Sequence, residues 1–453
     1  SQAGNGTLYN GNGTAWMVYA NHVGSTLGGG VSLNPPVSMG DNIYYRSGVW
    51  NRSSTDYTGY ELWKSDGTAN GTVQVKDINS GTANSDPEQL TVIGNTLFFT
   101  AEDGSPGSHP SLWKTDGTEA GTVRLTNPTY QGGPFGLSVM NDTLYFCNGG
   151  LWKSDGTING TMLVHQESGW GVCRGETTVV GNTIYFAGTA SVGNDGIELW
   201  KSDGTANGTV QVKDIRSNSP NSMPSDFIAM GNAVYFNAND GIHGKELWKS
   251  DGTANGTVLV KDLWNGNLDQ AWNGAQQMTV IGNTLYFTSS TATYGNELWK
   301  SDGTTNGTML VKDIANGSVG SNPGYLAPVD NTLFFTADDG TNGRELWKSD
   351  GTASGTVMVK DINNGSGDSS PNHHLKVGNT HFFRANDGIH GTELWRSDGT
   401  EAGTLMVQDI RNGTDGSLTN YQFTSIGTTL YFQANDGTGS QLWALDPTNI
   451  ILN

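Results

Sequence analysis

The sequence is poor in cysteine, in basic residues and in long hydrophobic runs. Only two of its 453 residues are cysteine, which excludes a disulfide-dense scaffold as the main source of stability. Lysine and arginine number 23 against 43 acidic residues, the formal charge is −20, and no basic run appears. No nucleic-acid partner is therefore expected, because such partners require surfaces rich in Lys and Arg. No apolar segment reaches the length of a membrane-spanning helix, so no membrane span is predicted.

Hydrophobic residues are also scarce, at 34% of the chain, whereas glycine is abundant, at 65 residues. Such a composition would favour disorder if aromatic residues were missing as well. The chain nevertheless holds 43 aromatic residues, and these gather in short runs of the length of β-strands. A folded, soluble protein built from strands is expected.

A Leu-Trp pair recurs along nearly the whole chain and marks nine units. The pairs end at Trp63, Trp113, Trp152, Trp200, Trp248, Trp299, Trp347, Trp395 and Trp443. Successive pairs are 50, 39, 48, 48, 51, 48, 48 and 48 residues apart, so one unit is clipped and the others keep one length. A fixed period of this size indicates a repeat architecture. The tryptophans are interpreted as structural, since each can bury a large area between neighbouring units.

Each unit contains four short apolar runs separated by Gly, Asn and Asp. In the segment 256–303 these runs are GTVLVKDL, QQMTVIG, NTLYFTS and NELWKSDG. The Gly-Asn at 282–283 has the form of a two-residue turn, and SDGT followed by NGT predicts a second hairpin. In that hairpin the Asp should accept backbone N–H groups while the Gly takes a positive φ. Four antiparallel strands per unit are typical of a β-propeller blade.

The predicted fold is therefore all-β, a β-propeller of nine four-stranded blades whose ring is closed by terminal strands. The segment NGTAWMVYA, residues 12–20, looks like the NGT strand of a unit, whereas the last Leu-Trp at Trp443 has no NGT strand after it. Together the two ends would make one blade without exposed edges. The alternative is that the C-terminal LWALDPTNIILN forms its own hairpin, which would give eight blades plus an extra terminal sheet element.

The expected domain organisation is a single propeller at 12–446, preceded by an N-terminal extension at 1–11 and followed by a C-terminal strand or tail at 447–453. The chain begins at Ser1 rather than Met, which fits removal of a signal peptide and equally fits trimming. Export is favoured.

The units resemble the ELWxxDGTxxGT repeat of bacterial secreted and surface proteins. The match rests on ELW at 61–63, DGT at 66–68 and GT at 71–72, and it returns at 198–209, 246–257, 297–308, 345–356 and 393–404. The segments 111–118, 150–157 and 441–448 depart from it. The hairpin also resembles that of TolB-like propellers. This resemblance implies an extracellular or cell-surface location and no single chemistry.

The two cysteines lie close to the clipped unit. Cys147 stands at the edge of its shortened loop and Cys173 stands early in the next unit. A disulfide between them is predicted for an exported protein, and two buried thiols are the alternative.

Acidic loops before the Leu-Trp pairs are candidate calcium sites. They place Asp, Asn and Glu oxygens among glycines, and calcium takes such oxygen ligands. Asp-Gly is equally a common hairpin turn, so a structural role is the alternative. Calcium is the only cofactor for which candidate ligands were found, and these are the pairs Asp240 with Glu246, Asp339 with Glu345, and Asp387 with Glu393.

The triplet Asn-x-Ser/Thr occurs twelve times, so the chain is a candidate glycoprotein. Asn-Gly is also a turn signal, which accounts for many of these triplets. The hairpin tips should be exposed, and the favoured acceptors are Asn70, Asn159, Asn207, Asn255 and Asn306.

The sequence offers little support for catalysis. It contains no HExxH, GxSxG, P-loop or CxxC motif. The densest imidazole cluster, His373 and His374 with His381, is better explained by variation between units at the start of a strand. No catalytic residue is predicted.

The predicted function is that of a non-enzymatic extracellular structural or adhesive module, able to self-assemble into a filament or surface layer by exchange of terminal strands. Its expected partners are further copies of itself or glycans of the cell surface or matrix. The first alternative is a carbohydrate-binding propeller that uses the aromatic residues Trp50, Trp170, Trp264 and Trp272. A glycan-active enzyme is the third reading.

Overall fold

The computed structural model describes residues 8–10, 13–15, 17–20, 36–48, 59–68, 70–105, 109–126, 133–166, 173–189, 196–217, 221–263, 274–418, 423–437 and 440–446. Within these ranges the regular elements are all β-strands. No helix in this part of the chain is long and apolar enough to cross a membrane.

The chain divides into two compact units. Unit 1 comprises Ser1–Gly133, Ile362–Asn364 and Ser369–Asn453, and unit 2 comprises Pro134–Asp361 and Gly365–Asp368. The described residues form four four-stranded antiparallel sheets in unit 1 and five in unit 2. Four antiparallel strands in meander order make a propeller blade. The protein is therefore an all-β, nine-bladed β-propeller, and the predicted number of blades is confirmed.

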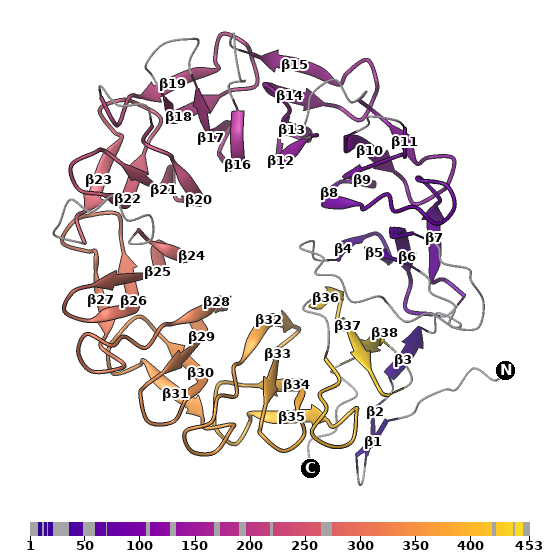
Figure 1. Ribbon diagram of the computed structural model, residues 1–453, viewed down its shortest axis with the longest axis vertical. Coiled ribbons are helices and arrows are strands. Elements are labelled where there is room, and N and C mark those ends of the chain that lie inside the picture. Colours follow the sequence, from indigo (N-terminus) through magenta and orange to yellow (C-terminus); the bar gives the residue numbers. More distant parts are fainter. Residues whose placement is uncertain are drawn as a thin grey trace. The chain divides into compact units, whose positions relative to one another are not determined.

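In unit 1, consecutive blades contact one another through their first strands (Figure 1). The strands are β4–β7 (Val37–Met39, Asn42–Ser47, Glu61–Ser65, Val73–Lys76), β8–β11 (Glu88–Ile93, Thr96–Ala101, Ser111–Thr115, Val123–Arg124), β32–β35 (Asn372–Val377, Thr380–Asn386, Thr392–Ser397, Leu405–Gln408), and β36–β38 (Phe423–Ile426, Thr429–Asn435, Ser440–Leu445) with β3 (Met17–Ala20). Strands β1 (Leu8–Asn10) and β2 (Gly13–Ala15) form a separate two-stranded sheet.

In unit 2, five consecutive blades contact one another in the same way (Figure 1). Their strands are β12–β15 (Phe135–Met140, Thr143–Cys147, Leu151–Ser154, Met162–His165), β16–β19 (Cys173–Val180, Thr183–Thr189, Ile197–Ser202, Val210–Lys213), β20–β23 (Ser225–Met230, Ala233–Asn239, Lys245–Ser250, Val258–Lys261), β24–β27 (Gln276–Ile281, Thr284–Thr291, Gly295–Ser301, Met309–Lys312), and β28–β31 (Gly324–Val329, Thr332–Asp338, Arg344–Ser349, Val357–Lys360).

Each sheet begins one strand later in the sequence than the repeat unit does, because the first run of a unit pairs with the preceding blade. The run GTVLVKDL contains β23, which pairs with β22 of the preceding blade and not with β24–β26. The reason is local, since the SDGT-to-NGT hairpin joins each Leu-Trp strand directly to the strand that follows it. The last Leu-Trp strand, β38, must therefore obtain its outer neighbour from elsewhere.

That neighbour is β3, from the start of the chain. Strand β3 pairs antiparallel with β38, and Met17 faces Leu445 while Ala20 faces Leu442. The predicted pairing of the two ends within one blade is confirmed. The alternative C-terminal strand falls in residues 447–453, which lie outside the described residues.

Within each of the two compact units the core lies between consecutive blades. In β25 the run Leu285, Tyr286 and Phe287 is buried without alternation. Leu285, Phe287 and Trp299 pack in one cluster with Leu247 of the preceding blade. Eight of the nine Leu-Trp tryptophans are buried, and Trp152 of the clipped unit is half-buried. Their predicted role between blades agrees with this packing.

The SDGT-type hairpin that follows a Leu-Trp strand is held by its own side chains. Asp302 Oδ1 accepts hydrogen bonds from the backbone N–H (2.8 Å) and the hydroxyl (2.7 Å) of Thr304. The hydroxyls of Ser301 and Thr308 lie 2.7 Å apart, and that of Thr308 donates to the Thr304 carbonyl at 2.7 Å. Gly303 has a φ of 87°. Both predicted features of the SDGT turn are therefore confirmed, and the turn needs Asp, Gly and Thr at these places.

Substitution of the hairpin glycine Gly351 by alanine should be destabilising by about 3 kcal/mol. Its φ is 86°, and a Cβ there would lie 2.3 Å from the hydroxyl of Tyr286 in the preceding blade. In a Tyr286→Phe background the same change should cost only about 1 kcal/mol, because the steric part is removed. Urea denaturation of the four proteins measures the cycle. An equal cost in both backgrounds would show that the close contact is not the cause.

Candidate functional site

Six of the nine Leu-Trp pairs are preceded by a glutamate, which is buried and accepts hydrogen bonds from the loop that follows its blade. Glu297 accepts from the backbone N–H groups of Ala315 (3.1 Å) and Ser321 (2.8 Å) and from the hydroxyl of Ser321 (2.5 Å). Glu61 and Glu198 make equivalent bonds. Burial raises the pKa of all three carboxyl groups, while the hydrogen bonds act to lower it. The glutamate therefore anchors the loop to the blade.

Sequence reasoning missed this role, although a signal was present. The bonded serine lies 24 residues after the glutamate in four bonded pairs. The residue 24 positions after Glu345 is also a serine, whereas the residue 24 positions after Glu246 is Gln270. The pairs are Glu61 with Ser85, Glu198 with Ser222, Glu297 with Ser321, and Glu393 with Ser417.

Lysines at two places of the repeat join consecutive blades. Lys300 Nζ donates to the carbonyl of Gly351 at 2.9 Å, and Lys312 Nζ donates to that of Thr356 at 2.7 Å. The first joint recurs from Lys64, Lys153, Lys201 and Lys249, and the second from Lys76, Lys213 and Lys261. The polar residues that define the repeat thus have structural partners.

The candidate calcium ligands lie in two different environments. Asp240 Oδ1 accepts from the backbone N–H groups of Ile242 and His243, and its Oδ2 lies 2.7 Å from His243 Nδ1. Burial acts to raise the pKa of Asp240, and these bonds lower it. Asp339 and Asp387 hold their loops in the same way.

The partner glutamates, Glu246, Glu345 and Glu393, are buried within their blades. Glu246 accepts from the backbone N–H of Leu263, and Glu393 from that of Ile410. Among the described residues no group of three or more His, Cys, Asp or Glu side chains is arranged to hold a metal ion. Calcium binding stays a prediction, which calorimetric titration with calcium chloride can test.

The five favoured glycan acceptors are exposed at hairpin tips, and they are Asn70, Asn159, Asn207, Asn255 and Asn306. The threonine of the triplet is used by the fold, as for Thr257, whose hydroxyl donates to the carbonyl of Thr253 at 2.7 Å. Ser354 and Ala402 replace the asparagine in two hairpins of the same form. The fold therefore requires the Gly-Thr but not the Asn.

Cys147 and Cys173 form a disulfide with a Cα–Cα distance of 5.4 Å. Cys147 ends β13 and Cys173 begins β16, so the bond joins the clipped blade to the next. Reduction should lower the free energy of unfolding of unit 2 by about 3 kcal/mol, because the bond closes a loop of 26 residues. The check is the urea midpoint with and without dithiothreitol. The Cys147→Ala/Cys173→Ala variant serves as control, since its midpoint must not respond to the reductant.

The histidines His374 and His381 stack at the start of the blade β32–β35. His374 Nδ1 lies 3.0 Å from His381 Nε2, and the ring centroids are 5.0 Å apart. Burial holds the pKa of His374 well below its ordinary value and lowers that of His381 to about 3. His373 on the same strand has a pKa lowered to about 4 by burial and by Arg384. The stacked pair therefore belongs to the core as neutral imidazoles.

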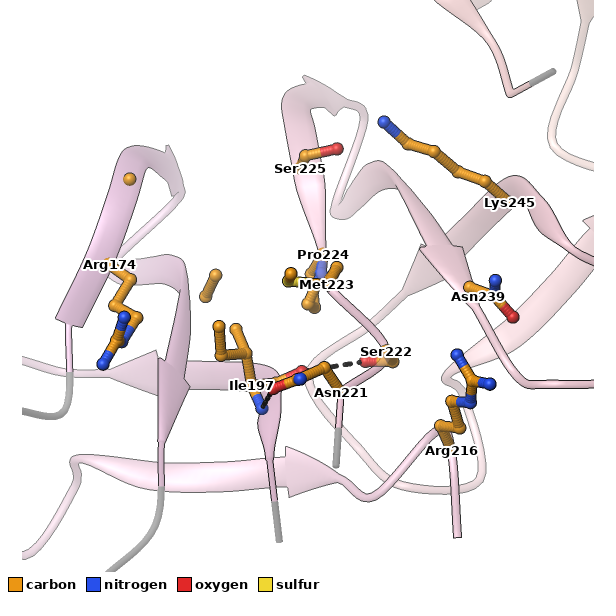
Figure 2. A pocket seen from close by; sticks show the side chains of 12 residues that line it. Arg174, Ile197, Arg216, Asn221, Ser222, Met223, Pro224, Ser225, Asn239 and Lys245 are labelled. Atoms are coloured by element: carbon orange, nitrogen blue, oxygen red, sulfur yellow. Dashed lines mark hydrogen bonds between the residues drawn. The ribbon is translucent and has the colours of Figure 1, made fainter. Parts of the chain in front are cut away.

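A cavity of about 450 Å³ lies between the blades β16–β19 and β20–β23 of unit 2. Arg174 of β16 lies on one side, while Arg216 and Lys245 lie on the other (Figure 2). Ile197, Met223 and Pro224 supply apolar surface between them. None of these residues belongs to the predicted sites.

The loop that lines the cavity is held in place by polar contacts. Asn221 Oδ1 accepts from the backbone N–H of Ile197 at 2.8 Å (Figure 2), and Ser222 donates to the buried Glu198. Met223 has a φ of 50° and is 56% exposed. This exposure matters because a large apolar side chain at a cavity mouth is available to a ligand.

Fold and cavity together define a β-propeller with a small-molecule-sized cavity between two blades. No protein-family model and no curated protein matches the sequence.

Solved structures with similar folds include the computationally designed Ika8 protein, with 14% identity, a TM-score of 0.44, and coverage of 79% of this chain and 95% of that one. BamB from Moraxella catarrhalis has 16% identity and a TM-score of 0.40, with 79% and 96% covered. The β-propeller domain of the Trilobed protease from Pyrococcus furiosus has 12% identity and a TM-score of 0.35, with 72% and 97% covered. None of these likenesses is close enough to carry an argument about function.

Proposed function

We propose that the protein is a non-enzymatic extracellular structural or adhesive propeller that self-associates by exchange of its N-terminal strand. The observation that carries this proposal is the pairing of β3 with β38. Elsewhere the outer strand is tied to its blade by a hairpin, as β27 is tied to β26. Strand β3 has no such hairpin, so a β3 from a second molecule can form the same hydrogen-bonded ladder.

Further observations support the non-enzymatic and extracellular parts of the proposal. The repeated glutamates, aspartates and lysines contact backbone groups of the fold rather than converging on one site. The disulfide between Cys147 and Cys173 favours an oxidising compartment. An outside location also fits the resemblance of the units to the ELWxxDGT repeat of secreted proteins.

The test is a pair of cysteines at facing positions of the two strands, Val18→Cys with Ala444→Cys. After oxidation, strand exchange gives a ladder of covalent oligomers on a non-reducing gel, and electron microscopy of the unmodified protein shows chains of particles. The Val18→Cys single variant is the control, because it can form dimers at most. Bonds that form only within single chains, together with isolated particles, would show the assembly proposal to be wrong.

Carbohydrate binding is the second candidate function, and the cavity between β16–β19 and β20–β23 favours it. The aromatic residues that the sequence offers for this role, Trp50, Trp170, Trp264 and Trp272, lie outside the described residues. A glycan array probed with the purified protein tests this function directly.

A further inference from the structure

One basic side chain of the cavity, that of Arg174, is specific to this place in the repeat. Arg174 faces Ala187 across the β16–β17 ladder. The equivalent ladder positions of other blades hold Glu88, Phe135, Ser225, Gln276, Gly324 and Asn372. None of these is basic, so the fold itself does not require a cation here.

Basic residues are also scarce in this chain, which has a formal charge of −20. Most lysines of the repeat donate to carbonyl groups of the next blade. Three of the remaining cations, Arg174, Arg216 and Lys245, nevertheless line one cavity. The carboxylate of Asp226 lies 3.4 Å from Lys245 Nζ, and its side chain is 54% exposed. Local positive charge in an acidic protein favours an anionic ligand.

The cavity also has the features of a site for an organic molecule. Its volume, about 450 Å³, falls in the range of small-molecule sites. The exposed side chain of Met223, with Pro224 and Ile197, offers an apolar surface between the basic residues. The amides of Asn221 and Asn239 add hydrogen-bonding groups at the same cavity. A simple inorganic anion would leave this apolar and amide surface unused.

We propose that this cavity binds a sugar that carries an acidic group. The ring lies against Met223 and Pro224, its hydroxyls meet the asparagine amides, and its carboxylate, sulfate or phosphate lies between Arg174 on one side and Arg216 on the other (Figure 2). Arginine suits this role because its guanidinium group forms paired hydrogen bonds to such anions. This proposal names a ligand class for the second candidate function, carbohydrate binding, and rests on that function. It does not depend on strand exchange.

The experiment is isothermal titration calorimetry of the full chain with glucuronate, glucose 6-sulfate, glucose 6-phosphate, glucose and inorganic sulfate. The three acidic sugars separate the possible acidic groups, and glucose and sulfate separate the contributions of ring and charge. The test variant is Arg174→Gln. The matched control is Arg411→Gln, which removes an arginine that follows the KDI-type segment of another blade as Arg216 does and that pairs with Asp415.

We expect at least one acidic sugar to bind more tightly than both glucose and sulfate, and Arg174→Gln to weaken it at least about tenfold while Arg411→Gln does not. Equal binding of inorganic sulfate would overturn the proposal, as would acidic-sugar binding that Arg174→Gln leaves unchanged. Binding of neutral sugars alone would overturn the acidic specificity and leave the carbohydrate-binding function standing. If the protein bound none of these ligands and nothing on the glycan array, both the acidic-sugar site and the carbohydrate-binding function would be overturned.

Discussion

Replacing Glu297 by alanine should lower the free energy of unfolding of its blade by about 4 kcal/mol. The change leaves three buried donors without their acceptor, namely the backbone N–H groups of Ala315 and Ser321 and the hydroxyl of Ser321. Each unsatisfied buried donor costs about 1–3 kcal/mol, and the loop from β27 to β28 loses its anchor. Urea denaturation combined with hydrogen exchange in β26–β28 measures the loss and locates it.

Two further variants make this prediction specific. Glu176→Ala removes a carboxylate of the same unit that is exposed, and it should change stability by less than about 0.5 kcal/mol. Glu297→Gln keeps one acceptor oxygen and should fall between the two. If the free energy of unfolding of the Glu297→Ala variant lies within about 1 kcal/mol of that of the parent protein, the buried glutamate does not anchor the loop.

Replacing His374 by Met and His381 by Leu should remove most of the acid sensitivity of the blade β32–β35. These are the residues that the blade β24–β27 carries at the same positions, Met278 and Leu285. The unfolded histidines bind protons below their ordinary pKa of 6.5, whereas burial keeps the pKa of His381 near 3 and that of His374 also low. The unfolded state therefore gains protons first, and stability falls as the pH falls below 6.5.

The expected difference is large because both rings are buried. Each histidine contributes up to about 1.4 kcal/mol per pH unit below its unfolded pKa, so the pair accounts for about 3 kcal/mol between pH 6.5 and 5. Glu393 acts with the opposite sign, because burial raises its pKa to about 7 from 4.5 and its contribution falls as the pH rises between those values. Glu393 is common to both proteins, so its effect cancels in the comparison.

The measurement is the urea midpoint of parent and variant from pH 5 to pH 7.5. The control is Leu375→Ala, which changes the packing of the same blade without removing a titratable group and should therefore lower the midpoint by a similar amount at every pH. Parallel curves for the parent and the His374→Met/His381→Leu variant would show that the stacked pair is not the acid-sensitive element.

The blade count and the closing strand could be predicted because both rest on local patterns that repeat. The Leu-Trp spacing counts the blades, and the NGT pattern at 12–20 identifies a strand without its own hairpin. The phase of the sheets was harder, since GTVLVKDL lies next to both β22 and β24 in sequence. Only the tight SDGT turn decides which neighbour it joins.

The site could be predicted far less well. The sequence suggests calcium or a plain turn for the ELW glutamates Glu246, Glu345 and Glu393. It does not indicate the loop anchor, because a bonding partner such as Ser321 lies 24 residues from its glutamate and carries no chemical signature of its own. The cavity gathers Arg174, Arg216 and Lys245 from three separate segments of two blades, so no motif connects them. Such a site exists only after the blades have packed.

The lysine joints between blades bear on how such a protein can change in length over generations. A unit carries both halves of its own joint, the donating Lys300 and a receiving carbonyl like that of Gly351 in the next copy. Because the halves are alike in five copies, a gene that gains or loses one of these copies by recombination still encodes a chain in which the lysine of one copy meets the carbonyl of the next. The joint is the same whatever the number of copies. Unequal crossing-over can therefore alter the number of blades without requiring a new kind of contact.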